Sequence, residues 1–208
     1  MSSIPEKFVL RSTLTSPFGR KVRMVIEVLG LGDRVSLVPA DPLDESDTLR
    51  QQNPLGKMPC LLLSDGTSIY DSGVIIDYLQ ELKGTDKLIP PRGLARFKAL
   101  TLARLADGIL DASILVIYDS RFRPGEPPSE RWLAHQRGKI NRGLAAFQSA
   151  LPDPRKTDIV SIGLSCALGY LDWRKQVDWR PIYPGLVEWL AQFAAHEPAF
   201  ERSRAPAS

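Results

Sequence analysis

Apolar and polar residues in the first part of the chain follow two different periods. The run Lys7–Arg11 is centred on three consecutive apolar residues and predicts a strand. Ser16 and Pro17 follow, and they suit the cap and the first turn of a helix. Apolar residues then recur about every 3.6 residues, at Phe18, Val22, Val25, Ile26 and Leu29. We therefore expect a strand followed by an amphipathic helix that ends at Gly30.

The next fifty or so residues predict a small sheet with tight turns. Three further strands are expected at Val35–Pro39, Cys60–Leu63 and Ser68–Tyr70. A short helical segment near Ser46–Gln52 and the turn Asn53–Gly56 separate the first two of them, and Asp65-Gly66 suits a hairpin. Asp71 and Ser72 then start a second full helix. The order βαβ followed by ββα predicts an α/β domain with a four-stranded mixed sheet.

The pattern changes after Gly84, where a short segment with two prolines precedes a wholly helical region. Four helices are predicted there: Leu94 to about Arg121, Glu130–Leu151, Ile159 to about Trp173, and Leu186 to about Ala195. The second of these places Trp132, Gln136, Ile140, Leu144, Phe147 and Leu151 on one face. We therefore expect an α/β domain at 1–84, a linker at 85–92 and an all-helical domain at 93–208.

Composition narrows the function classes. The 27 basic and 24 acidic side chains leave a net charge of +3, too small for a nucleic-acid footprint. No apolar run reaches the roughly 18 residues of a membrane span, and the first residues lack a secretory signal pattern. We therefore expect a cytoplasmic protein that binds neither nucleic acid nor membrane.

The few cysteines and histidines argue against metal and triad chemistry. Cys60 and Cys166 are far apart and lack metal-ligand spacing, so they indicate buried residues in a reducing compartment. His135 and His196 are isolated in the sequence. We expect no metal site.

Three local motifs could carry chemistry, and each has a purely structural alternative. Ser16 starts a helix, where free N–H groups favour an anion; the alternative is a plain N-cap. A cis peptide at Met58–Pro59 would leave the Met58 backbone free to pair with a peptide-like ligand; the alternative is a turn before a strand. Asp71 and Ser72 could bind the ammonium and carboxylate of an amino acid; the alternative is helix capping.

The order and spacing of these motifs resemble the glutathione transferase superfamily. S-P-F-x-R-K-V-R begins at Ser16 after the first strand, N-P-L-G-K-x-P begins at Asn53, and D-S begins at Asp71. The likeness is greatest to the serine-type branch, meaning the plant tau class and related bacterial enzymes. It extends to residues 105–112, 139–142 and 166–171. The resemblance implies a thioredoxin-like N-terminal domain followed by an all-helical C-terminal domain.

The resemblance also implies a role for each matched residue. Ser16 would donate to the glutathione sulfur, Lys57 would lie near the glycyl end, and the Met58 backbone would pair with the cysteinyl part. The implied glutathione-binding residues are Ser16, Phe18, Lys57, Met58, Pro59, Asp71 and Ser72. Ser16 is the catalytic residue in this interpretation, and Thr15 is the alternative.

The implied activity is conjugation of glutathione, a co-substrate, to a hydrophobic electrophile in detoxification. Leu14, Ile114 and Tyr118 are the candidate contacts for the electrophile, although core packing is an equal alternative for the last two. Arg121-Phe122-Arg123 indicates a solvated helix end more than an anion site. The family is commonly dimeric, so we expect a homodimer.

Two positions depart from the common pattern. The family usually starts its late helix with Ser or Thr and has Asp three residues on, whereas this chain has Asp158 and then Ser161. Both types can cap a helix. Redox members of the superfamily carry Cys where this chain has Ser16, so thiol–disulfide exchange is disfavoured.

Other functions stay open at this point. The chain could hold glutathione or apolar ligands without turnover. It could also be a glutathione-dependent isomerase, dehalogenase or peroxidase, because the same activated thiolate serves all of these reactions. An interaction module within a larger assembly is a third alternative.

Overall fold

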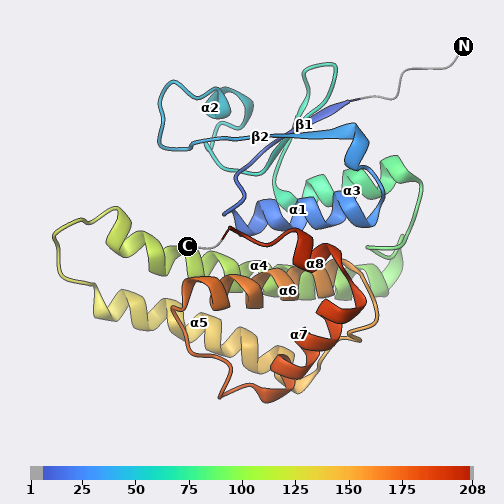
Figure 1. The fold of residues 1–208 in the computed structure, drawn as a ribbon. Coiled ribbons are helices and arrows are strands. Elements are labelled where there is room, and N and C mark those ends of the chain that lie inside the picture. Colours follow the sequence, from blue (N-terminus) through green and yellow to red (C-terminus); the bar gives the residue numbers. More distant parts are fainter. Residues whose placement is uncertain (1–6, 207–208) are drawn as a thin grey trace, which may run out of the picture. The chain divides into compact units, whose positions relative to one another are not determined.

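The computed structural model describes residues 7–206, and these form two compact units (Figure 1). The first unit comprises residues 7–88 together with 199–206, and the second comprises residues 89–198. Residues 199–206 thus group with the first unit, whereas the sequence pattern assigned them to the second domain. The domain boundaries at 84 and 93 stay a prediction.

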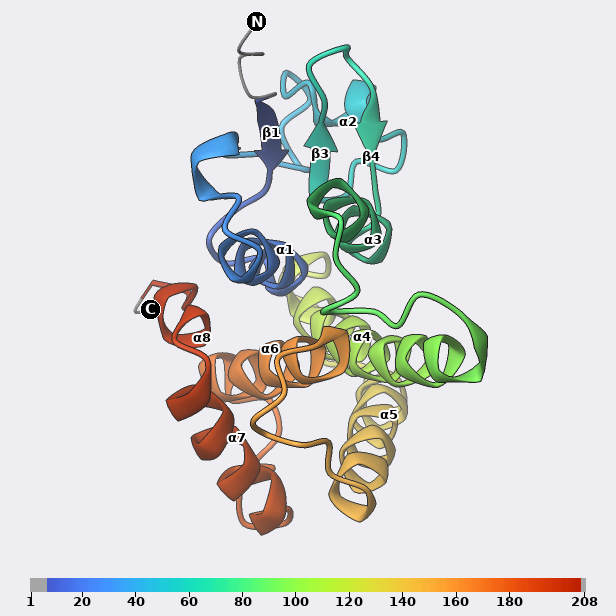
Figure 2. The same cartoon turned by 90° about the vertical axis from the view of Figure 1, so that its right-hand side faces the viewer.

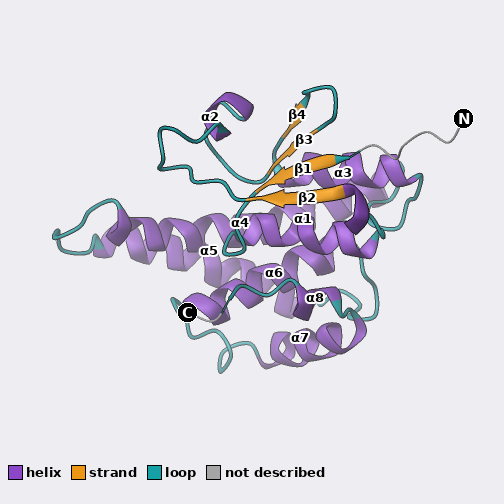
Figure 3. Ribbon diagram, turned by 45° about the horizontal axis from the view of Figure 1, so that its top comes forward, coloured by secondary structure: helices purple, strands orange, loops and turns teal. Residues whose placement is uncertain are grey.

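The first unit is built on a four-stranded mixed sheet, as the sequence predicts (Figure 3). Its strands are β1 (Phe8–Arg11), β2 (Val35–Val38), β3 (Cys60–Leu62) and β4 (Ser68–Ile69). Their spatial order is β2-β1-β3-β4; β2 is parallel to β1, and the pairs β1–β3 and β3–β4 are antiparallel. The fold class is therefore confirmed for this unit.

Two long helices cover one face of this sheet. Helix α1 (Pro17–Val28) and helix α3 (Ser72–Lys83) lie side by side there, and the segment with α2 (Leu49–Gln52) lies on the other side (Figures 1 and 2). The face of α1 that carries Val22, Val25 and Ile26 is buried, as its apolar period predicts. A 3₁₀ turn, η1 (Gly32–Arg34), leads into β2.

A short helix near the end of the described chain, α8 (Ala199–Arg202), docks on α1 and was not predicted. Arg20 holds it. Its guanidinium donates to the Phe200 carbonyl at 2.7 Å and to Ser203 Oγ at 3.2 Å, and it lies 4.3 Å from the centre of the Phe200 ring. Arg20 is buried, with 7% of its surface exposed. An exposed ion pair between Arg202 of α8 and Glu27 of α1 also joins the two helices.

The second unit is wholly helical, as expected. It contains α4 (Gly93–Arg121), α5 (Glu130–Ser149), α6 (Ile159–Arg174) and α7 (Pro184–His196). Helix α6 is buried almost all round because α4 and α7 both pack on it. Helix α5 ends before Leu151, which is 42% exposed, and Trp132 is 41% exposed, so the buried face predicted for this helix holds only in its middle.

At the start of α6, Asp158 and Ser161 cap the helix in the order opposite to the family's usual one. Asp158 Oδ1 accepts from the N–H groups of Val160 and Ser161 at 3.0 Å each, and Ser161 Oγ accepts from the N–H of Asp158 at 3.0 Å. This is a reciprocal capping box with the two residue types exchanged. Among the described residues, no helix is long and apolar enough to cross a bilayer.

We predict that Arg20→Met destabilises the first unit by about 2–4 kcal/mol. The change removes charge-assisted hydrogen bonds and a buried ring contact while keeping most of the side-chain volume. Arg202→Met is the matched control, because its ion pair is exposed and should contribute less than about 1 kcal/mol. Urea unfolding of both variants measures the difference. Equal losses would show that Arg20 does not anchor α8.

Candidate functional site

The three motifs meet at one edge of the sheet because of strand direction and register. Arg11, the last residue of β1, pairs with Cys60, the first residue of β3. Strand β4 runs antiparallel to β3 with Ile69 opposite Leu61, so β4 ends where β3 begins. The chain after β1, before β3 and after β4 is therefore brought together. These are the segments that hold Ser16, Met58–Pro59 and Asp71-Ser72.

Ser16 is the N-cap of α1. Its Oγ accepts from the N–H of Gly19 at 3.0 Å, and its side chain is half-buried. Close packing requires glycine at position 19, since a Cβ there would lie 1.9 Å from Ser12 Oγ and 3.1 Å from Ser12 Cβ. Ser12 is fully buried, and its N–H donates to the Val38 carbonyl at 3.1 Å. The first turn of α1 is thus fitted tightly against the end of β1.

Threonine hydroxyls connect this turn to the second motif. Thr13 Oγ1 lies 3.5 Å from Met58 Sδ and 3.1 Å from Thr15 Oγ1. Thr15 itself is exposed. The Thr13 contact ties the loop before α1 to the chain before β3, and the sequence motifs gave no signal for it.

The peptide bond between Met58 and Pro59 is cis, as predicted. A buried side chain, Asn53, shapes the turn before it. Asn53 Nδ2 donates to the Lys57 carbonyl at 2.8 Å, and Asn53 Oδ1 accepts from the N–H of Leu55 at 3.1 Å. Lys57 extends its side chain at the surface. Asn53 thereby positions Lys57, whose charge the motif singles out, and Met58, whose backbone it singles out.

The third motif opens α3. Asp71 is the N-cap, and its Oδ1 accepts from the N–H groups of Gly73 at 2.9 Å and Val74 at 3.4 Å. The peptide bond before it, from Tyr70, is also cis. Ser72 is 2% exposed, whereas Asp71 is exposed. Helix capping is therefore a real role of Asp71, and ligand binding would be an additional one.

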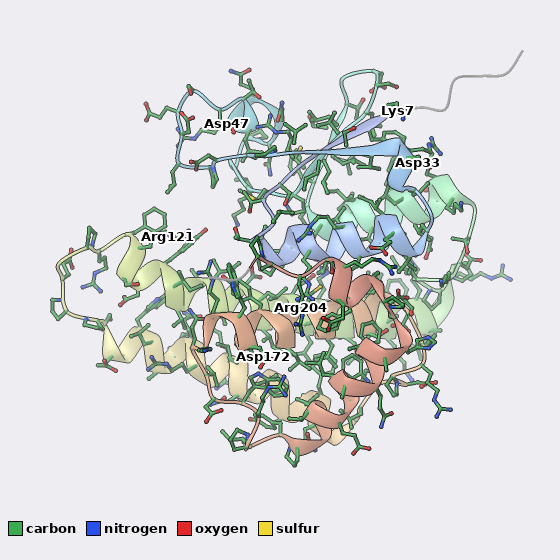
Figure 4. All side chains as sticks on the ribbon, in the orientation of Figure 1. Lys7, Asp33, Asp47, Arg121, Asp172 and Arg204 are labelled. Carbon is green, nitrogen blue, oxygen red and sulfur yellow. The ribbon has the colours of Figure 1, made fainter. Side chains whose placement is uncertain are left out.

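A partly buried ion pair supports the same edge from the α2 side. Arg11 donates to three acceptors on the segment that follows β2: Asp47 Oδ1 at 2.7 Å, Thr48 Oγ1 at 2.9 Å and Gln52 Oε1 at 3.1 Å. The N–H groups of Asp41 and Leu49, and then Arg11, hold the pKa of the Asp47 carboxyl below its ordinary value. Figure 4 labels Asp47 in this segment.

The only cysteine at this edge is unsuited to catalysis. Cys60 is fully buried, and burial raises the pKa of its thiol. Neither Cys60 nor Cys166 forms a disulfide. Within residues 7–206, no group of three or more metal-binding side chains could hold an ion.

The remaining candidate residues lie in different surroundings. Phe18 is half-buried, with the Lys21 ammonium 5.7 Å from its ring centre, and Leu14 is 46% exposed. In the second unit, Ile114 is half-buried on α4. Tyr118, 36% exposed, lines a hollow of about 440 Å³ with Phe122 and Trp132. The roles of Leu14, Ile114 and Tyr118 toward an electrophile stay predictions.

Comparison with known proteins decides the family. The family model described as the glutathione S-transferase N-terminal domain matches residues 15–82. The chain is 32% identical over 202 residues to the uncharacterized GST-like protein YibF of Escherichia coli (strain K12), which covers 95% of this chain and 98% of that protein. The chain belongs to the glutathione transferase family.

Solved structures of family members agree with this assignment. A glutathione transferase family member from Pseudomonas fluorescens Pf-5, with bound glutathione, is 40% identical and superposes with a TM-score of 0.88. The match covers 96% of this chain and 100% of that one. A second Pseudomonas fluorescens Pf-5 structure, 39% identical over the same shares with a TM-score of 0.85, contains S-(propanoic acid)-glutathione. The first unit thus has the thioredoxin-like fold of the family's N-terminal domain.

We predict that Asn53→Ala loosens the turn before Pro59. Removing a buried side chain with two backbone hydrogen bonds should cost about 1–3 kcal/mol of stability. Glutathione affinity, measured by calorimetry, should fall with it. Gln51→Ala, at an exposed position in the same segment, should leave both unchanged. If Asn53→Ala bound glutathione like the parent protein, Asn53 would have no positioning role.

Proposed function

We propose that this chain binds glutathione at the sheet edge described above and conjugates it to an electrophile. The observation that carries the proposal is the position of Ser16 at the first turn of α1, beside the other two motifs. The bound glutathione in related structures supports the same assignment. In this proposal the Met58 backbone pairs with the cysteinyl part, Lys57 faces the glycyl carboxylate, and Asp71 with Ser72 holds the γ-glutamyl end. Phe18 and Pro59 form the walls of the proposed glutathione site.

The serine acts as a hydrogen-bond donor in the proposed mechanism. A hydroxyl has one donor and two acceptor positions, and Ser16 Oγ already accepts from the N–H of Gly19. Its hydrogen is therefore the part that serves a ligand. A free thiol has a pKa near 8.5, so lowering it by about 2 units needs roughly 2.7 kcal/mol of preference for the thiolate. Donation from Ser16, the nearby N-terminus of α1 and backbone amides together supply an interaction of that size.

The chemical step follows from the stabilised thiolate. Its sulfur attacks an electrophilic carbon and forms a C–S bond. With an aryl halide the halide leaves with the bonding pair, and with an activated alkene the new carbanion takes a proton from water. Ser16 stays protonated throughout and stabilises the negative charge on sulfur. Conjugation is favoured over disulfide exchange because a serine cannot form a mixed disulfide with glutathione.

We predict that Ser16→Ala lowers kcat/KM for an aryl halide about 10²- to 10³-fold, the usual cost of removing one charge-stabilising donor. The ultraviolet absorbance of bound thiolate at neutral pH should disappear, while glutathione still binds. Ser16→Gly should lose the same activity. It keeps the helix start within a few tenths of a kcal/mol, whereas alanine costs about 1 kcal/mol there.

Thr15→Ala is the matched control at the neighbouring exposed hydroxyl, and it should keep its activity. Undiminished conjugation in Ser16→Ala would assign thiol activation to another group, with Thr15 tested next. A parent protein that binds glutathione but converts no aryl halide would support a binding protein instead.

We also propose that the protein is a homodimer that works in the cytoplasm. The first half of α4 exposes three large apolar side chains: Leu94 at 69%, Phe97 at 65% and Leu102 at 40%. An exposed apolar group of this kind is typical of a protein–protein contact. Two buried cysteines without a disulfide suit the reducing compartment in which glutathione is abundant.

Light scattering after gel filtration should give twice the mass of one chain. Phe97→Glu should shift the protein toward the monomer, because it places a charge in the apolar contact. Lys98→Glu, which changes the charge of the next residue without removing an apolar side chain, should stay dimeric. A monomeric parent protein would contradict this prediction.

A further inference from the structure

Arg11 lies on the face of the sheet that carries the α2 segment. Side chains alternate along a strand, so Phe8 and Leu10 share one face of β1 and Arg11 lies on the other. The Phe8 ring makes an edge contact with Tyr78 of α3, which identifies its face as the one covered by the long helices. Only 8% of the surface of Arg11 is exposed. A cation removed from water to this extent is costly unless it is paired.

The guanidinium of Arg11 holds both ends of α2. It donates to Thr48, the N-cap of this helix, and to Gln52, its last residue. The other terminal nitrogen pairs with Asp47, whose side chain is 13% exposed. A helix of four residues is not stable by itself, so its position depends on these bonds and on the packing of Leu49, which is fully buried.

Asp47 joins the loop before α2 to the same guanidinium. Its Oδ2 accepts from the N–H of Asp41 at 2.9 Å, and its Oδ1 accepts from the N–H of Leu49 at 2.7 Å as well as from Arg11. The carboxylate therefore closes the chain between Asp41 and Leu49 into a compact loop. Arg11 fastens that loop, together with α2, to the sheet.

The contacts of Asn53 connect α2 to the second motif. Asn53 follows Gln52 directly and is 2% exposed, and its N–H donates to the Leu49 carbonyl at 2.7 Å. Its side chain donates in turn to the Lys57 carbonyl at 2.8 Å. A displacement of α2 would move Asn53, and Asn53 would move the backbone of Lys57. A continuous path of contacts thus runs from Arg11 through α2 to Lys57.

We propose that Arg11 is a positioning residue that sets the selectivity of this protein for the glycyl end of glutathione. This role rests on the proposed function, in which Lys57 faces the glycyl carboxylate. Arg11 acts through α2 and Asn53, which fix the place of Lys57. The starts of α1 and α3 are held separately, by the caps Ser16 and Asp71. Loss of the Arg11 contacts therefore weakens recognition of the glycyl end and spares the rest of the tripeptide.

Isothermal titration calorimetry on the full chain tests the proposal with two peptides, glutathione and γ-glutamylcysteine, which lacks the glycine. The parent protein should bind glutathione about tenfold or more tightly, because a charge-assisted contact to the glycyl carboxylate is added. Arg11→Gln and Asp47→Asn should each reduce that preference to about threefold or less while γ-glutamylcysteine binding persists. Asp44→Asn is the matched control, since the exposed Asp44 carboxylate accepts locally from Ser46, at 2.8 and 2.7 Å, and should keep the preference.

A double variant tests whether Arg11 acts through Lys57. Lys57→Ala should also reduce the preference, and Arg11→Gln combined with Lys57→Ala should reduce it no further, because both changes interrupt one path. Persisting γ-glutamylcysteine binding shows that the rest of the site stays folded, which a general loss of structure would not allow.

Three results would overturn the proposal alone, with glutathione binding by the parent intact. These are equal weakening of both peptides in Arg11→Gln and Asp47→Asn, an undiminished preference in those variants, and additive losses in the double variant. A parent protein that binds neither peptide would overturn the proposed function as well.

Discussion

The pairing of β1 with β3 is the interaction on which the candidate site depends. It places the end of β1 opposite the start of β3, and β4 then returns to the same edge. A shift of one residue in this register would turn every side chain of a strand to the other face. The loop before α1, the turn before Pro59 and the start of α3 would then no longer meet. The register is protected because Leu10 and Leu61, which face each other across the pair, are both buried.

Much of this arrangement could be predicted from the sequence because it rests on local signals. The capping residues, the apolar period of α1 and the Asp-Gly turn each act within a few residues, and the helices and strands appear where they indicate. The motif that starts at Asn53 predicted the cis bond before Pro59. It did not show that Asn53 itself is buried and holds the turn, because that depends on which backbone groups come within its reach.

The features that the sequence could not predict join distant segments. In the sequence pattern Arg20 is simply a basic residue on a helix. Only the fold brings it into contact with Phe200, which lies 180 residues later in the chain. Thr13 and Met58 meet through sheet register alone. In each case the contact follows from tertiary packing, which periodicity and capping signals do not encode.

The docking of α8 on α1 has a consequence for how the chain is made. The first unit takes its last helix from residues that follow the whole of the second unit, so it is interrupted by residues 89–198. During synthesis the sheet and α1 emerge first, with the surface around Arg20 uncovered. The partner of that surface becomes available only after the helical unit has left the ribosome. The unit that holds the candidate site therefore completes its fold last, although its motifs are translated first.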